Sequence, residues 1–145
     1  MSLKVICGSD HAGFSLKEIL KSKINDMGYE AVDCGTYSPE EPVDYPDYAA
    51  SVVNLLKKEP GNLGVLICGS GIGISIAANR FSGIRAALCY DVTSARLSRI
   101  HNNANILVLG ERLIGTYTAE ECLEAFLTTP FKGSERHQRR IEKLG

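Results

Sequence analysis

The chain has 145 residues, of which 44% are hydrophobic and 23% charged, and its formal net charge is -1. This length and composition are typical of one globular domain, so we expect residues 1–145 to fold as a single domain without a disulfide or metal staple. The near-zero charge and the absence of any apolar run of about 20 residues argue against nucleic-acid binding and against a membrane span.

Short apolar runs alternate along the chain with segments of helical periodicity. In the first half this pattern predicts strands over Leu3–Ser9, Glu30–Cys34 and Leu63–Cys68, and helices over Ala12–Met27 and Tyr48–Glu59. Gly35–Pro46 combines Gly, Pro and acidic residues and is predicted to be a loop.

The second half continues the alternation. It predicts strands over Ile84–Cys89 and Asn105–Leu109, helices over Ile74–Arg80, Val92–His101 and Thr116–Leu127, and a charged final helix within Lys132–Gly145. Strands that alternate with helices of this size form right-handed crossovers, so we expect an α/β fold in which helices cover both faces of one parallel sheet.

The chemically unusual residues follow three of the predicted strands. Asp10 and His11 come after the first, Cys68 and a Gly-rich turn end the third, and Glu111-Arg112 follows the fifth. Because ligands bind outside the carboxyl ends of such strands, we expect a site at this edge of the sheet.

The Gly-rich turn spans Gly69–Gly73 in the sequence Gly-Ser-Gly-Ile-Gly. We expect its three glycines to adopt positive φ and to direct N–H groups into one concavity at a helix N-terminus, where an anion would bind. No Gly-Lys-Ser/Thr follows, so it is not a P-loop, and the third glycine comes one residue early for a dinucleotide fingerprint. A tight turn of purely structural role is the alternative.

Cys68 directly precedes this turn and favours the functional interpretation. The N-terminal end of a helix stabilises a thiolate, which suits nucleophilic attack or proton abstraction next to a carbonyl. The other cysteines form no Cys-x-x-Cys pair, and we expect them to be small buried hydrophobes: Cys7, Cys34, Cys89 and Cys122. Unpaired thiols and an N-terminus without a signal-peptide layout favour a cytoplasmic protein.

Two ionisable groups have both a functional and a structural interpretation. Asp10 is either a site residue or a cap of the following helix. His101 ends a predicted helix, where it either complements the helix dipole or acts in acid/base chemistry.

Several arginines could hold a phosphate through paired donors. Arg136 and Arg140 lie four residues apart on one face of the last predicted helix, and Arg112 follows the fifth strand. A solvated charged tail is the alternative, which we favour for Lys132, Arg139 and Lys143. For His137 the two interpretations are equally supported.

With these elements the sequence resembles the type B ribose-5-phosphate isomerases, whose family also includes allose-6-phosphate and galactose-6-phosphate isomerases. The stretch Cys-Gly-Ser-Gly-Ile-Gly-Ile-Ser-Ile-Ala-Ala-Asn-Arg at 68–80 is its most specific part. Further matching segments are Gly-Ser-Asp-His-Ala-Gly-Phe at 8–14, Asp-Tyr-Pro-Asp-Tyr-Ala at 44–49, Gly-Ile-Arg-Ala-Ala at 83–87, Ser-Arg-Ile-His-Asn-Asn-Ala-Asn at 98–105 and Arg-His-Gln-Arg-Arg at 136–140. The resemblance therefore covers essentially the whole chain.

The resemblance implies a Rossmann-like, three-layer α/β/α protein with a five-stranded parallel sheet, assembled as a homodimer or a dimer of dimers. It implies an aldose–ketose isomerase of the pentose phosphate pathway that interconverts ribose 5-phosphate and ribulose 5-phosphate without a metal or organic cofactor. The catalytic base of this family is a cysteine in one branch and, in another, a glutamate six residues further on. Cys68 and Ile74 occupy these positions, so the chain resembles the cysteine branch. Ser70 stands where many members of that branch have threonine.

The resemblance also implies a role for each site residue. Cys68 would move a proton between C2 and C1 through a cis-enediolate, and His101, assisted by Asp10, would open the sugar ring. The developing oxyanion would be held by the turn, that is Gly69, Ser70, Gly71, Ile72 and Gly73. Phosphate would be bound by His11, Arg112, Arg136 and Arg140, a sugar hydroxyl by Asn102, and Tyr45 would line the pocket. His101, Asn102 and the terminal arginines would come from the neighbouring subunit.

Two other classes of function share some of these features. A regulatory module that binds a phosphosugar or nucleotide would use the turn but would need neither Cys68 nor His101. A thiol-based acyl or phosphoryl transferase would form a covalent intermediate on Cys68. The sequence leaves open whether the substrate has five or six carbons and whether the assembly is a dimer or a tetramer.

Overall fold

The structure is a computed structural model, and it describes residues 3–145. The strands are β1 (Lys4–Ser9), β2 (Glu30–Asp33), β3 (Leu63–Cys68), β4 (Ala86–Leu88) and β5 (Ile106–Gly110). The helices are α1 (Phe14–Asp26), α2 (Tyr45–Lys58), α3 (Ile72–Asn79), α4 (Val92–Asn102), α5 (Thr116–Thr128) and α6 (Glu135–Leu144), and a short 3₁₀ turn, His11–Gly13, precedes α1. Across this described part of the chain, no helix has the length and apolar character that a membrane crossing requires.

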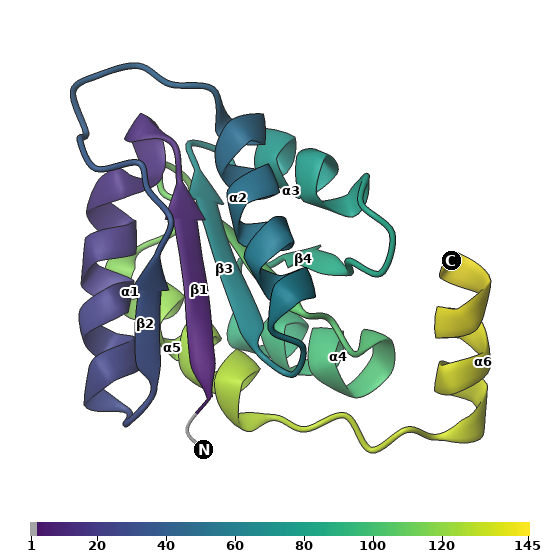
Figure 1. The fold of residues 1–145 in the computed structure, drawn as a ribbon. Coiled ribbons are helices and arrows are strands. Elements are labelled where there is room, and N and C mark those ends of the chain that lie inside the picture. Colours follow the sequence, from purple (N-terminus) through teal and green to yellow (C-terminus); the bar gives the residue numbers. More distant parts are fainter. Residues whose placement is uncertain (1–2) are drawn as a thin grey trace.

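The five strands form one parallel sheet in the order β2-β1-β3-β5-β4, which confirms the predicted α/β fold (Figure 1). The chain leaves β1 toward one edge for β2 and returns to the other side for β3. The strand order therefore reverses between β1 and β3, and their carboxyl ends flank the crevice in which sheets of this type bind ligands.

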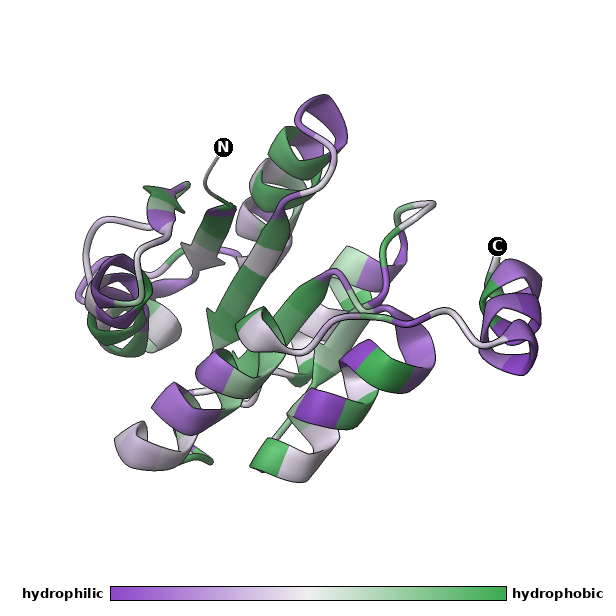
Figure 2. Cartoon of the chain, turned by 90° about the horizontal axis from the view of Figure 1, so that it is seen from below, coloured by the Kyte–Doolittle hydropathy of each residue, from purple (hydrophilic) through white to green (hydrophobic). Residues whose placement is uncertain are grey.

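Helices cover both faces of the sheet and produce three layers. α1, α4 and α5 pack on one face, and α2 and α3 on the other. Along β3 successive side chains alternate between the two cores, because Val65 and Ile67 face the first group of helices while Leu66 and Cys68 face the second. Figure 2 shows the apolar strands enclosed between helices whose polar faces turn outward.

Two helices begin earlier than the sequence pattern predicted. α2 starts at Tyr45 instead of Tyr48, so the last two residues assigned to the 35–46 loop are helical. Pro46 is compatible with this start, since its fixed φ and missing N–H are tolerated in the first turn of a helix. α3 starts at Ile72 instead of Ile74, and the second half of the Gly-rich turn is thus its first turn.

The charged C-terminal segment does form a helix, and α6 stands apart from the sheet beside α4 (Figure 1). An extended segment over residues 129–134 leads to it. The contact between the two helices includes the stacked rings of His101 and His137, whose centroids lie 4.7 Å apart. Ile141 is the buried residue of α6, and most of its remaining surface is hydrophilic (Figure 2).

A buried ion pair joins α1 to β2. The ammonium group of Lys17, whose side chain is only 1% exposed, lies 2.6 Å from Asp33 Oδ1. Lys21 Nζ lies 2.7 Å from the other carboxylate oxygen, and the Gly35 amide donates to Oδ1 at 2.8 Å. Burial acts to raise the pKa of Asp33, but the hydrogen bonds from the two lysines outweigh it and hold the pKa below its usual 3.8.

We expect Asp33→Asn to lower the free energy of unfolding at pH 7 by about 3 kcal/mol, because it leaves the buried Lys17 ammonium with only the more exposed carboxylate of Glu18, 3.7 Å away, as a counter-charge. Glu59→Gln is the matched control. It removes the 3.3 Å pair with Lys4, both of whose side chains are more than one third exposed, and should cost less than about 1 kcal/mol. Urea denaturation measures both.

The pH dependence gives a second test of the same pair. Because the pKa of Asp33 is lowered in the folded protein, its contribution is present above the unfolded value near 3.8 and is lost as the pH falls through the folded value. The difference between wild type and Asp33→Asn should therefore be constant near neutrality and shrink in acid. A difference that grows on acidification would contradict this assignment.

Candidate active site

A pocket of about 520 Å³ opens at the carboxyl ends of β1, β3 and β5. It unites groups that lie far apart in the sequence but follow neighbouring strands. Its lining consists of Asp10, His11, Ala12, Tyr45, Cys68, Gly69, Ser70, Ile72, Gly73, Arg112 and Leu113. The structure thus brings together most of the predicted site residues at the predicted edge of the sheet.

Cys68 ends β3 beneath the Gly-rich turn. Its side chain is nearly buried, and the Gly71 N–H donates to Cys68 Sγ at 3.2 Å. The next amide, of Ile72, donates to Ser70 Oγ at 3.2 Å. An N–H group aimed at sulfur favours the charged thiolate over the thiol.

The expectation of positive φ at all three glycines of the turn was wrong in two cases. Only Gly71 has a left-handed backbone, with φ of 78°, whereas Gly69 and Gly73 do not. Gly73 is required for a different reason, since a Cβ atom there would lie 2.5 Å from Cζ of Tyr45. The missing side chain lets the Tyr45 ring pack directly on the start of α3.

The pKa values of the other four thiols are raised. Burial is the main cause throughout; it raises the pKa of Cys7 to about 12, with the charge of Asp33 adding to the effect, and that of Cys122 to about 11. Burial also raises the pKa of Cys34 and of Cys89. Cys7, Cys89 and Cys122 are buried as predicted, whereas Cys34 is only half-buried. Cys68 is the one cysteine among the lining residues of the pocket.

The structure confirms the capping role of Asp10 and also places the residue at the pocket. Its Oδ1 accepts from the Gly13 N–H at 3.1 Å and so caps the 3₁₀ turn, while the residue also lines the pocket. The neighbouring His11 accepts the Val43 N–H at Nδ1, at 3.1 Å. A neutral imidazole that accepts at Nδ1 carries its proton on Nε2, so His11 has a donor left for a ligand.

Glu111 has a structural role that the sequence analysis did not assign. Its Oε1 accepts from the Leu16 N–H at 2.6 Å and thereby caps the first turn of α1 from a distant loop. The backbone on either side is fixed as well, since the Glu111 N–H donates to Cys68 O and the Arg112 N–H to Gly69 O, both at 3.0 Å. Arg112 is thus held at the rim of the pocket.

Four predicted site residues lie elsewhere on this chain. His101 and Asn102 are exposed at the end of α4, and Arg136 and Arg140 are exposed on α6. None of them is among the lining residues of the Cys68 pocket. Three of them, His101, Arg136 and Arg140, form with His137 a basic group around the contact between α4 and α6, where loss of solvent and the charges of the neighbours lower the pKa of His137.

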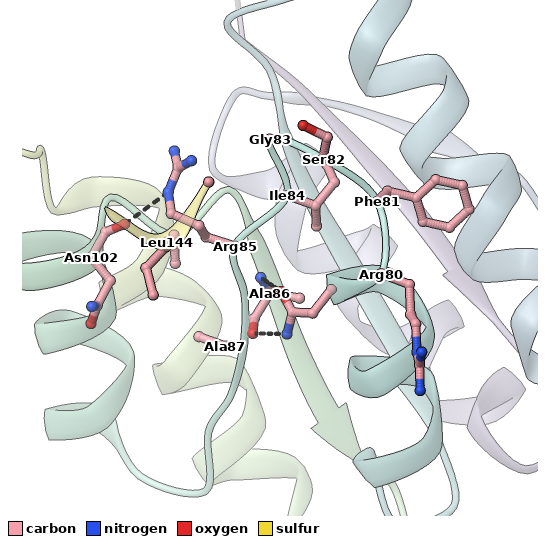
Figure 3. A pocket seen from close by; sticks show the side chains of 13 residues that line it. Arg80, Phe81, Ser82, Gly83, Ile84, Arg85, Ala86, Ala87, Asn102 and Leu144 are labelled. Atoms are coloured by element: carbon pink, nitrogen blue, oxygen red, sulfur yellow. Dashed lines mark hydrogen bonds between the residues drawn. The ribbon is translucent and has the colours of Figure 1, made fainter. Parts of the chain in front are cut away.

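A larger cavity, of about 720 Å³, lies between the end of α6 and the segment from Arg80 to Ala87. Figure 3 shows Leu144 of α6 on one side of it and Arg85, bonded through Nε to the Asn102 carbonyl at 2.9 Å, nearby. Its lining side chains include no cysteine, histidine or carboxylate. The smaller pocket at Cys68 is therefore the candidate active site.

Metal chemistry was not expected from the sequence. Over residues 3–145 no cluster of three or more histidine, cysteine or carboxylate side chains has the proximity needed to hold a metal ion.

Comparison with known proteins agrees with this fold. A model of the family described as ribose/galactose isomerase matches residues 5–144. The chain is 43% identical over 141 residues to ribose-5-phosphate isomerase B of Escherichia coli, covering 97% of this chain and 93% of that protein. A solved ribose 5-phosphate isomerase from Thermotoga maritima is 53% identical, with a TM-score of 0.94 over 99% of this chain and 98% of its own. The type B enzyme of Trypanosoma brucei superposes with a TM-score of 0.95 at 45% identity, over 99% of this chain and 97% of its own.

Fold and similarity together define an isomerase of the three-layer α/β/α class. The chain belongs to the ribose/galactose isomerase family, as the resemblance of its motifs predicted.

We expect Cys68 to react with iodoacetamide at pH 7.5 at least about tenfold faster than any other cysteine, because only thiolates are alkylated and the other four thiols have raised pKa values. Quenched time points, digestion and mass spectrometry of each cysteine peptide measure this. In a Cys68→Ser variant the fast phase should disappear. Faster alkylation of the half-buried Cys34 than of Cys68 would contradict the assignment of Cys68 as the reactive thiol.

Proposed function

We propose that this protein interconverts ribose 5-phosphate and ribulose 5-phosphate, with Cys68 as the base. The observation that carries the proposal is the Cys68 thiol, which accepts a backbone N–H within a pocket that also contains His11 and Arg112. The names of its relatives, ribose-5-phosphate isomerase B among them, support this choice of substrate.

The reaction moves one proton between adjacent carbons of the open-chain sugar. The Cys68 thiolate takes the proton from C2, the C–H electrons form the C1–C2 double bond, and negative charge passes to the C1 oxygen. Backbone N–H groups of the Gly69–Gly73 turn stabilise this oxyanion before the proton returns to C1. The C2 hydroxyl gives its proton to the C1 oxygen, an exchange that Ser70 supports, and the new carbonyl forms at C2.

Ring opening precedes this step for the aldose. We assign it to His101 as acid/base, assisted by Asp10. The phosphate is bound by Arg112 and by the Nε2 donor of His11, which the contact from Val43 leaves directed away from the loop. Tyr45 lines the sugar pocket.

The remaining groups come, in this proposal, from a second copy of the chain. His101, Asn102, Arg136 and Arg140 are exposed and lie outside the Cys68 pocket of their own chain. At the pocket itself α3 exposes two isoleucines one turn apart, Ile72 at 50% and Ile76 at 53%. Exposed apolar side chains beside a site are typical of a subunit contact, so we propose a homodimer with composite sites. The five free thiols fit a reducing, cytoplasmic setting.

A direct assay of ribulose 5-phosphate formation tests the function. Cys68→Ala should lower kcat by about 10²–10⁴-fold and leave binding of inorganic phosphate intact, because the fold and the basic residues remain. Cys68→Ser should be similarly poor, since a hydroxyl does not ionise near neutral pH. Cys34→Ser is the control and should keep its rate.

Two outcomes would overturn parts of this proposal. A Cys68→Ala protein with most of its rate would exclude the thiol as the base. Faster turnover of allose 6-phosphate or galactose 6-phosphate than of ribose 5-phosphate would show that the preferred substrate is a six-carbon sugar phosphate.

Complementation tests the shared site. Cys68→Ala and Arg136→Ala proteins, each inactive alone, are unfolded and refolded together. In a mixed dimer with composite sites, one site collects both lesions and the other none, so random mixing should restore about a quarter of wild-type activity. If mixed dimers form, as native mass spectrometry can verify, and activity stays absent, each site is built within one chain.

A further inference from the structure

The peptide between Ser70 and Gly71 is held from both sides. On one side, the Tyr90 hydroxyl donates a hydrogen bond of 2.7 Å to the Ser70 carbonyl oxygen. On the other, the Gly71 N–H donates to Cys68 Sγ at 3.2 Å. Because the carbonyl and N–H of a trans peptide point in opposite directions, a partner that fixes the carbonyl also fixes the direction of the N–H.

The same peptide lies directly on the end of β5. A Cβ atom at Gly110 would be 2.4 Å from both the carbonyl carbon and the oxygen of Ser70, so the peptide occupies the space that any other residue would fill. Gly71 has a left-handed backbone and resists rotation of this peptide less than a residue with a side chain would. The orientation of the peptide thus depends on contacts with its carbonyl.

Tyr90 supplies that contact from outside the site. It lies in the segment between β4 and α4, its side chain is 38% exposed, and it is not among the residues that line the Cys68 pocket. Any influence on the reaction is therefore exerted through the turn.

We propose that Tyr90 is a positioning residue for the base: its hydroxyl holds the Ser70–Gly71 peptide in the orientation that presents the Gly71 N–H to the Cys68 sulfur. The reverse orientation would present a carbonyl oxygen instead, which disfavours the thiolate. This inference rests on the proposed role of Cys68 for its catalytic consequence, but its effect on the thiol can be measured without turnover.

Other ionisable groups line the same pocket as the thiol. Asp10 and His11 follow β1, Tyr45 begins α2, and Arg112 follows β5. Tyr90→Phe keeps the aromatic ring, removes one hydroxyl and leaves these four groups unchanged. A change in the titration of Cys68 in this variant therefore reports on the peptide.

The experiment follows the rate of Cys68 alkylation by iodoacetamide from pH 5 to pH 10, resolved by mass spectrometry of the Cys68 peptide. In Tyr90→Phe the midpoint should rise by about 0.5–1 pH unit, a three- to tenfold loss of reactivity below the midpoint. The acid limb of the kcat/KM profile should move by the same amount. Tyr117→Phe, at a 76% exposed tyrosine on α5, is the control and should move neither curve.

A second variant disturbs the same peptide from the opposite side. Gly110→Ala places a methyl group against the Ser70 carbonyl and should raise the midpoint in the same direction. Gly115→Ala, where nothing lies within 4 Å of an added Cβ, is its control. Circular dichroism verifies that each variant folds; if Tyr90→Phe does not, Tyr90→Leu, which also removes the hydroxyl, takes its place and decides the role of Tyr90.

The possible results separate this inference from the proposed function. A midpoint in Tyr90→Phe equal to that of Tyr117→Phe overturns the role of Tyr90. A shifted alkylation midpoint with an unchanged kcat/KM profile supports the positioning of the thiol and overturns Cys68 as the base. A shift in both supports both.

Discussion

Gly110, the last residue of β5, has no side chain, and this lets the turn after β3 lie directly against the end of that strand. The geometry of the site depends on that contact. The register pairs Cys68 with Gly110, so the sulfur and the turn lie where β5 ends. Backbone hydrogen bonds from Glu111 and Arg112 to Cys68 and Gly69 continue the contact beyond the strands. The backbone of Cys68, of the turn and of Arg112 is consequently fixed by main-chain interactions, and little backbone entropy remains to be lost when a ligand binds there.

This arrangement explains why the location of the site was predictable from the sequence. Buried parallel strands appear as short apolar runs, and Leu63–Cys68 was predicted with the bounds that the structure shows. Once the strands are known to be parallel, the residues that follow them must meet at one edge. That reasoning brought Asp10, Cys68 and Arg112 together although they are distributed over most of the chain.

The local conformation of the turn was harder to predict. The spacing of Gly69, Gly71 and Gly73 suggested one cause for all three, namely positive φ. In the structure Gly71 alone needs that conformation, and Gly73 instead makes room for the Tyr45 ring. Glycine in a sequence indicates either backbone freedom or a close neighbour, and only the packing distinguishes the two. The early start of α2 was missed because of a similar ambiguity, since proline is typical both of loops and of the first turn of a helix.

Contacts between distant elements could not be predicted at all. Lys17 pairs with Asp33, Leu16 is capped by Glu111, and Tyr90 bonds to Ser70, and each pair joins two elements whose relative register the periodicity of one chain does not define. Tyr90 reaches the turn past the end of β5, which lies between β3 and β4 in the sheet, an order that differs from the order in sequence. A tyrosine after a short edge strand has no distinguishing pattern of its own.

The basic group around the contact between α4 and α6 is explained by electrostatics. Two histidines and two arginines gather where the rings of His101 and His137 stack, and loss of solvent together with the neighbouring charges lowers the pKa of His137. Within one chain these basic side chains have no counter-charge, since no ion pair among the described residues joins them to a carboxylate. A bound anion makes such a group of positive charges favourable, because each positive side chain attracts the phosphate. In the proposed composite site, the phosphate of a substrate held by the partner's pocket supplies that charge. In that proposed dimer, the separation of the thiol from Arg136 and Arg140 within one chain is a consequence of assembly, because each subunit contributes the proposed base to one site and positive charge to the other.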